Sequence, residues 1–178
     1  MHVNNWFFKA VDLYVASRQA IKALDLCLNY NIKISDEMAE KLSAADVEND
    51  EKLKILNKIA EGAYQQGNYH LATKKWTQAG NRLQAMKSLL KSGDTDKIIF
   101  FANVSRQREI YILAGNYLQT LDWRNNADIM KNIIAFYTKS KTYDLLAMFY
   151  QVLKLILFAV ESMVTVIFGA RLTAIICI

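Results

Sequence analysis

The stretch that decides the fold is residues 60–80, which read AEGAYQQGNYHLATKKWTQAG. Gly67 stands between two runs of residues whose apolar members follow helical spacing. Glycine tolerates left-handed backbone conformations, so Gly67 suits a tight turn between two helices. Ala60 and Ala72, one in each run, are small enough to let antiparallel helices approach closely. The stretch therefore predicts a compact helical hairpin.

The residues around this turn follow the order of a tetratricopeptide repeat, which the stretch resembles. The repeat-core residues are then Ala60, Gly67, Tyr69, Ala72, Trp76 and Ala79. Tyr69 and Trp76 would fill the groove against a neighbouring hairpin, so we interpret them as core residues and not as ligand-binding residues. An unrelated amphipathic hairpin could also carry glycine, tyrosine and alanine at these spacings by accident.

Outward from this hairpin, apolar residues follow helical spacing almost everywhere up to about residue 150. The 178 residues include no proline and only six glycines, as expected of a chain that is helix after helix. Ser17, Ser35 and Thr142 are each placed to cap a helix. We therefore predict an all-α fold over residues 1–150, an α-α superhelix built as a tetratricopeptide-like solenoid of helical hairpins with irregular repeat lengths.

Glycine also marks where helices end further along the chain. Gly80 and Gly93 follow apolar stripes, as Gly67 does, and each suits a left-handed C-cap. After Gly93 comes a short apolar run, Ile98 to Phe101, and then the clearest apolar stripe of the chain, from Ile110 to Leu121. Short helices joined by tight turns are typical of stacked-hairpin arrays.

Charge and cysteine content narrow the function classes. The net charge is +5, and the longest basic run, Lys74-Lys75, suits either a solvated helix face or a phosphate-binding patch. Neither Cys27 nor Cys177 has another cysteine or a histidine at zinc spacing. Two distant cysteines favour a reducing compartment over a disulfide framework. We expect no metal and no cofactor.

The sequence also lacks the motifs of an enzyme. Catalysis needs a nucleophile with a base, paired carboxylates, a metal cluster or a phosphate loop. No glycine-rich phosphate loop is present, and Asp46, Glu48, Asp50 and Glu51 fit neither a calcium loop nor a facing carboxylate pair. We interpret these four acids as solvated charge in a loop or the first turn of a helix. The chain is therefore predicted not to be an enzyme and to bind no small-molecule substrate.

Longer stretches resemble one known family, the C-terminal repeat region of the intraflagellar transport 140 subunit. They are Gln66–Gly80, Ala85–Thr95, Val104–Ile112, Asn116–Arg124 and Ile129–Ile134. The resemblance spans roughly residues 5–150 and includes polar surface positions as well as apolar stripes. It implies a subunit segment of intraflagellar transport complex A, which acts in retrograde transport, cilium assembly and the entry of membrane proteins into cilia. It brings no catalytic residues.

The resemblance also implies partners and a location. The partners would be other complex A subunits, in the cilium (its base and axoneme) and the cytoplasm. Candidate contact residues are Lys74, Lys75, Arg106 and Arg108. An alternative is a helical-repeat RNA-binding module, since some hairpin arrays read one base per repeat. Scattered Lys and Arg argue against it, so we expect no nucleic-acid partner.

The mostly apolar tail, residues 151–178, does not resemble the family. One interpretation is a membrane span that anchors the chain, but Lys154, Glu161 and Arg171 interrupt it before about 18 uncharged residues accumulate. A second is a buried final helix. A third, which we favour, is translation from Gln151 into an intron, because Gln-Val codons can match a splice donor. We expect residues 151–178 to lie outside the family fold and not to span a membrane.

Overall fold

The structure is a computed structural model that describes residues 3–17, 19–44, 48–156 and 158–159, and within these ranges the regular elements are all helices. The helices are α1 (Val3–Ala16), α2 (Ala20–Asn29), α3 (Asp36–Ser43), α4 (Asn49–Gln65), α5 (Tyr69–Gln78), α6 (Arg82–Ser92), α7 (Thr95–Ser105), α8 (Arg108–Gln119) and α9 (Ala127–Lys139). A further helix covers residues 143–156. The predicted all-α class is confirmed.

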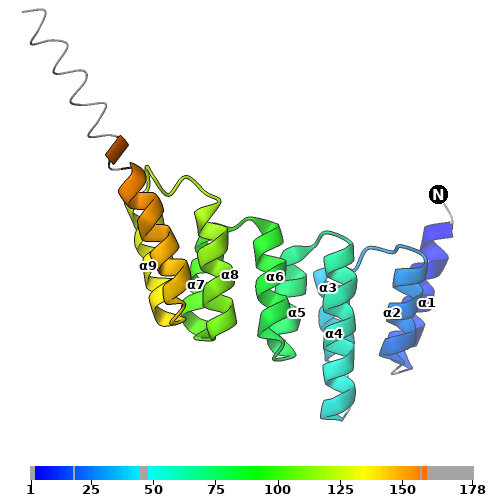
Figure 1. The fold of residues 1–178 in the computed structure, drawn as a ribbon. Coiled ribbons are helices and arrows are strands. Elements are labelled where there is room, and N and C mark those ends of the chain that lie inside the picture. The colour runs from blue at the N-terminus through cyan, green and yellow to red at the C-terminus, as the bar shows by residue number, and fades with distance from the viewer. Residues whose placement is uncertain (1–2, 18, 45–47, 157, 160–178) are drawn as a thin grey trace, which may run out of the picture.

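The helices stand in two rows that form an elongated stack (Figure 1). One row contains α2, α4, α6, α8 and helix 143–156, and α3, α5, α7 and α9 stand behind it. Consecutive helices such as α4 and α5, or α8 and α9, pack as antiparallel hairpins. Each hairpin contacts its neighbours along the stack, which is the arrangement of a helical solenoid. The predicted superhelix of tetratricopeptide-like hairpins is therefore confirmed.

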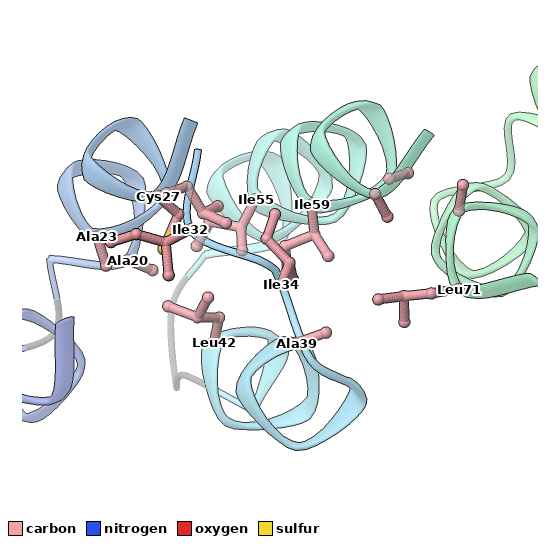
Figure 2. Close-up of a cluster of buried hydrophobic side chains, with 14 of the residues drawn as sticks. Ala20, Ala23, Cys27, Ile32, Ile34, Ala39, Leu42, Ile55, Ile59 and Leu71 are labelled. Atoms are coloured by element: carbon pink, nitrogen blue, oxygen red, sulfur yellow. The ribbon is translucent and has the colours of Figure 1, made fainter. Parts of the chain in front are cut away.

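The buried side chains form two clusters along the stack. The first joins α1 to α5 and the start of α6, and the second joins the rest of α6 to helix 143–156. In Figure 2, Ile34 lies between α3 and α4, facing Ile55 and Ile59. The Gln66 side-chain amide holds the segment that connects α2 to α3. Its Oε1 accepts from the Ile34 N–H and its Nε2 donates to the Ile32 carbonyl, both at 2.8 Å.

The turns of the central hairpins repeat at a fixed spacing. Gly67, Gly80, Gly93 and Arg106 follow one another at intervals of 13 residues, and all four have positive φ angles, 77°, 76°, 72° and 52°. After each glycine, an Asn or Asp side chain caps the next helix by accepting a backbone N–H, as Asn68 does from Leu71 at 3.3 Å. The glycine signals of the sequence therefore predicted these helix ends correctly.

Of the three Ser and Thr caps that the sequence predicted, Ser17 and Thr142 need correction and Ser35 is confirmed. Ser17 does not cap α2, because its hydroxyl donates to the Tyr14 carbonyl at 3.1 Å and Gln19 occupies the N-cap position. Ser35 does cap α3, accepting from the Met38 N–H at 3.2 Å. Thr142 stands just before helix 143–156, but its hydroxyl lies 2.7 Å from Ser140 Oγ, in the preceding turn.

Two segments extend beyond what their apolar residues indicated. The apolar run Ile98 to Phe101 is the centre of α7, a full helix that Asp94 caps. Helix 143–156 crosses the predicted domain boundary between residues 150 and 151, and Leu153 and Ile156 pack against the second cluster. The packed part of the chain therefore extends beyond residue 150. The interpretations of the tail from residue 160 onward fall outside the described residues.

The shared turn geometry predicts opposite effects at Gly93 and Arg106. Gly93→Ala is expected to lower the free energy of unfolding by about 1 kcal/mol, because alanine disfavours left-handed φ. A Cβ at Gly93 would meet nothing closer than 3.9 Å, so sterics with neighbours add little. Arg106→Gly should raise the same quantity by about 0.5 kcal/mol, since relief of strain outweighs glycine's freedom in the unfolded chain.

Urea unfolding followed by far-ultraviolet circular dichroism measures both changes. A shift of the same sign for the two variants would contradict a shared turn geometry.

Candidate interaction surface

The hairpin formed by α4 and α5 carries the predicted repeat-core residues. Ala60 and Ala72 are fully buried where the two helices meet, and Gly67 is in the left-handed conformation at their turn. Trp76 is 8% exposed, and its ring centroid lies 5.5 Å from that of Tyr64. These positions hold two helices and their neighbours together, which is a role in folding.

Tyr69 and Ala79 lie at the two ends of α5. The Tyr69 ring packs on Tyr64 with centroids 5.5 Å apart in an edge-to-face arrangement, and its side chain is half-buried. Ala79 is the C-cap residue of α5 and is also half-buried. Ser88 of α6 donates its hydroxyl to the Tyr69 carbonyl at 2.9 Å, so the start of α5 is also tied to the next helix.

Lys74 and Lys75 are neighbours in sequence but have different environments. Lys74 is exposed, and its Nζ lies 2.7 Å from Glu40 Oε1 of α3. The Lys75 side chain is fully buried, with its Nζ 2.8 Å from Ser43 Oγ and 3.2 Å from Glu40 Oε1. Lys75 therefore ties α5 to α3 inside the chain, and a role as a surface contact for partners is wrong.

Electrostatics supports the same interhelical tie. Hydrogen bonds from Lys74 and then Lys75 hold the pKa of the Glu40 carboxyl below its usual range. The hydrogen bond that Lys74 donates to Glu40 raises the pKa of the Lys74 amine above its ordinary value. Both groups are therefore charged at neutral pH, and Lys74 is already paired within the chain.

Arg106 and Arg108 also differ. The Nε of Arg108, at the start of α8, donates to the Ser140 carbonyl at the end of α9, 3.1 Å away. Arg82, at the start of α6, similarly donates to the Ser105 carbonyl at the end of α7 at 3.2 Å. A cation there satisfies carbonyls that a helix end leaves unpaired. Arg106 is exposed, and its side chain forms no hydrogen bond or ion pair among the described residues.

An apolar groove that the sequence did not reveal lies beside helix 143–156. It has a volume of about 640 Å³. Its lining comes from the loop after α8, from α9 and from helix 143–156, and comprises Trp123, Arg124, Met130, Ile134, Tyr150, Leu153, Lys154 and Ile156. We call this the apolar groove. Its residues come from three separate segments, none with a recognisable motif, so sequence reading could not assemble them.

Trp123 supports one wall of the apolar groove. Its ring is 4% exposed and packs edge-to-face on Phe149, with centroids 4.9 Å apart. The guanidinium of Arg124 lies over the Trp123 ring at 4.5 Å from the centroid, a cation–π contact that holds the charge at the edge of the groove.

A second apolar feature stands alone on α7. Phe100 and Val104 are 69% and 61% exposed, and one helical turn separates them on the same face. Large apolar side chains exposed side by side are typical of protein-contact sites. We call these two residues the α7 pair.

Neither a metal site nor a membrane span is found in the described part of the chain. Among those residues no group of His, Cys, Asp and Glu is arranged to hold a metal ion. No helix within the described ranges is both long enough and apolar enough to cross a bilayer. Cys27 is fully buried beside Met38, and burial raises the pKa of its thiol.

The stacked hairpins agree with the comparison with known families. Residues 1–136 match the family model that describes the TPR domain of the intraflagellar transport proteins 140 and 172. The chain belongs to this intraflagellar transport 140/172 TPR domain family. The match includes the α4–α5 hairpin and extends through most of α9, whereas the resemblance seen in the sequence was placed as far as about residue 150.

Membership of the intraflagellar transport 140/172 TPR domain family identifies the chain as a helical scaffold region related to intraflagellar transport. Such domains act through protein–protein contacts, and the family is associated with cilia. Helix 143–156 and one wall of the apolar groove lie beyond the matched residues.

Proposed function

We propose that this chain is a protein-interaction scaffold of intraflagellar transport complex A, without catalysis, that acts in retrograde ciliary transport and cilium assembly. Its partners would be other complex A subunits, at the ciliary base, along the axoneme and in the cytoplasm. The observation that carries the proposal is that a continuous stack of helical hairpins coincides with the residues that match the intraflagellar transport 140/172 TPR domain.

Physical features of the surface support a protein-binding role. The α7 pair offers two exposed apolar side chains on one helical face. Arg106, two residues beyond Val104, is the predicted contact residue that stays exposed without a side-chain partner among the described residues. An apolar centre with a charged rim is the usual composition of a binding patch. We propose the α7 pair and Arg106 as one contact surface. Lys74, on α5, is proposed as a separate contact residue.

The basic residues do not favour the RNA-binding alternative. Lys75 is buried, while Arg82 and Arg108 bind backbone carbonyls within the chain. Lys58 and Lys97 pair with Asp25 and Asp94. Nucleic acid is held chiefly by cations that are free to reach phosphates, and these five of the 22 lysines and arginines are engaged within the chain instead.

Co-purification from ciliated cells tests the proposed function. The tagged full chain is expected to retain other complex A subunits, identified by mass spectrometry. Phe100→Asp with Val104→Asp should reduce that retention, because two charges would be placed at an apolar contact. The matched control is Leu13→Asp on α1, where a leucine of similar exposure, 71%, takes the same substitution far along the stack.

The co-purification results test the proposed function and the position of the contact surface separately. A folded chain that retains no complex A subunit would overturn the proposed function. Retention that persists in the Phe100/Val104 variant but fails in the Leu13 variant would move the contact to the other end of the stack.

A further inference from the structure

The apolar groove has the size and composition of a binding site for side chains of another molecule. Its volume of about 640 Å³ accommodates several aliphatic side chains. Met130 and Ile134 line it from α9, and Leu153 and Ile156 line it from helix 143–156. All four are only half-buried, so they retain apolar surface that an occupant would remove from water.

The edge of the apolar groove is positively charged. Arg124 and Lys154 both line it and are both exposed. No aspartate or glutamate is among the lining residues, and among the described residues Lys154 forms no salt bridge. Arg124 stacks on the Trp123 ring, and in the described part of the chain it has no carboxylate partner either. The groove therefore combines an apolar interior with two cations at its rim.

We propose that the apolar groove binds an acidic amphipathic helix of a partner protein. Aliphatic side chains at helical spacing would enter between α9 and helix 143–156, and carboxylates beside them would pair with Arg124 and Lys154. Two adjacent helices present a furrow in which a third helix packs by the same ridge-and-groove geometry. The charge of the rim selects an acidic partner over a basic one.

This inference rests on the proposed function as a scaffold, and it names the chemistry of one partner segment. The α7 pair lies on a different helix from the residues that line the groove. Failure of co-purification and failure of groove binding are therefore separate results, because the groove can be tested with a peptide alone.

The test uses the full chain and a synthetic, fluorescently labelled helical peptide with leucines at positions i, i+3, i+4 and i+7 and glutamates on both flanks. Anisotropy is expected to show saturable binding. Arg124→Glu with Lys154→Glu should weaken it about tenfold, as should replacing the peptide's glutamates with lysines. The matched control, Lys87→Glu with Lys91→Glu on α6, makes the same charge change away from the groove and should leave the affinity unchanged.

Several outcomes would overturn the proposal. One is binding that is the same for the glutamate and lysine peptides, or the same for the groove and control variants. Another is a fatty acid, with oleate as the probe, that saturates the groove while the peptide fails to displace it. A third is self-association in sedimentation that the Arg124/Lys154 substitutions abolish, because a second copy would then be the occupant.

Discussion

Replacing Tyr137 with alanine is expected to lower the free energy of unfolding by about 3–5 kcal/mol, as for other large aromatic residues removed from a core. Tyr137, on α9, is fully buried in the second cluster. Its hydroxyl donates to Asn116 Oδ1 of α8 at 2.8 Å. The substitution removes the ring and leaves both a cavity and an unpaired amide oxygen between the two helices.

The same ring explains why position 115 is glycine. A Cβ built on Gly115 would lie 2.7 Å from Tyr137 Cε1 and 3.0 Å from its Cζ. The ring cannot swing aside freely, because it is buried and its hydroxyl is held by Asn116. Gly115→Ala should therefore destabilise by about 1–3 kcal/mol through overpacking.

A double-mutant cycle tests this contact more sharply than either substitution alone. In a Tyr137→Ala background the obstacle is gone, so Gly115→Ala should become stabilising by up to about 1 kcal/mol through helix propensity. Urea unfolding followed by circular dichroism gives the four free energies. Additive effects would show that Gly115 is not fixed by the Tyr137 ring.

Tyr137→Phe serves as the conservative control. It retains the ring and loses only the hydroxyl, so the expected cost is about 1 kcal/mol. Burial raises the pKa of Tyr137 to about 12. The phenol therefore remains protonated, and able to donate to Asn116, beyond the pH at which an exposed tyrosine ionises.

Trp76→Ala is expected to have an effect of similar size, about 3–5 kcal/mol, in the first cluster. The Trp76 ring contacts Tyr64 across the α4–α5 hairpin and is almost fully buried. Its removal opens a cavity where this hairpin packs on its neighbours. Circular dichroism during urea unfolding is the suitable measurement, because fluorescence would lose one of the three tryptophans.

His70→Ala is the matched control for Trp76. His70 is on the same helix but exposed, so its substitution should change stability by less than about 0.5 kcal/mol. A Trp76→Ala variant that loses no more stability than the His70→Ala variant would mean that Trp76 is not a repeat-core residue.

Local sequence signals predicted the helices because their causes lie within a few residues. Gly67, Gly80 and Gly93 end helices through their own φ angles, and Asn68 caps α5 through a side chain one turn away. Ser35 likewise caps α3. The signal failed at Ser17 and at Arg106. Ser17 could either cap α2 or donate to the Tyr14 carbonyl, both within a few residues, and the structure has the second bond. At Arg106, a residue other than glycine adopts the left-handed turn.

Which basic residues of the candidate interaction surface are exposed could not be predicted from local sequence signals. Lys74 and Lys75 are adjacent residues on one helix, yet α3 covers only Lys75. Arg108 finds its carbonyl 32 residues further along the chain. Whether a cation is free for a partner depends on which helix packs beside it, and that information is not contained in its neighbours in sequence.

The sequence by itself determined the helical class and the hairpin turns, because backbone preferences and periodic burial act over one or two helical turns. It indicated the family through the resemblance of longer stretches such as Gln66–Gly80. Only the tertiary structure decided that Gly115 must accommodate the Tyr137 ring and that Trp123, Ile134 and Leu153 share one apolar groove. These contacts join different helices, and their geometry is set by how the hairpins stack rather than by the spacing of residues along the chain.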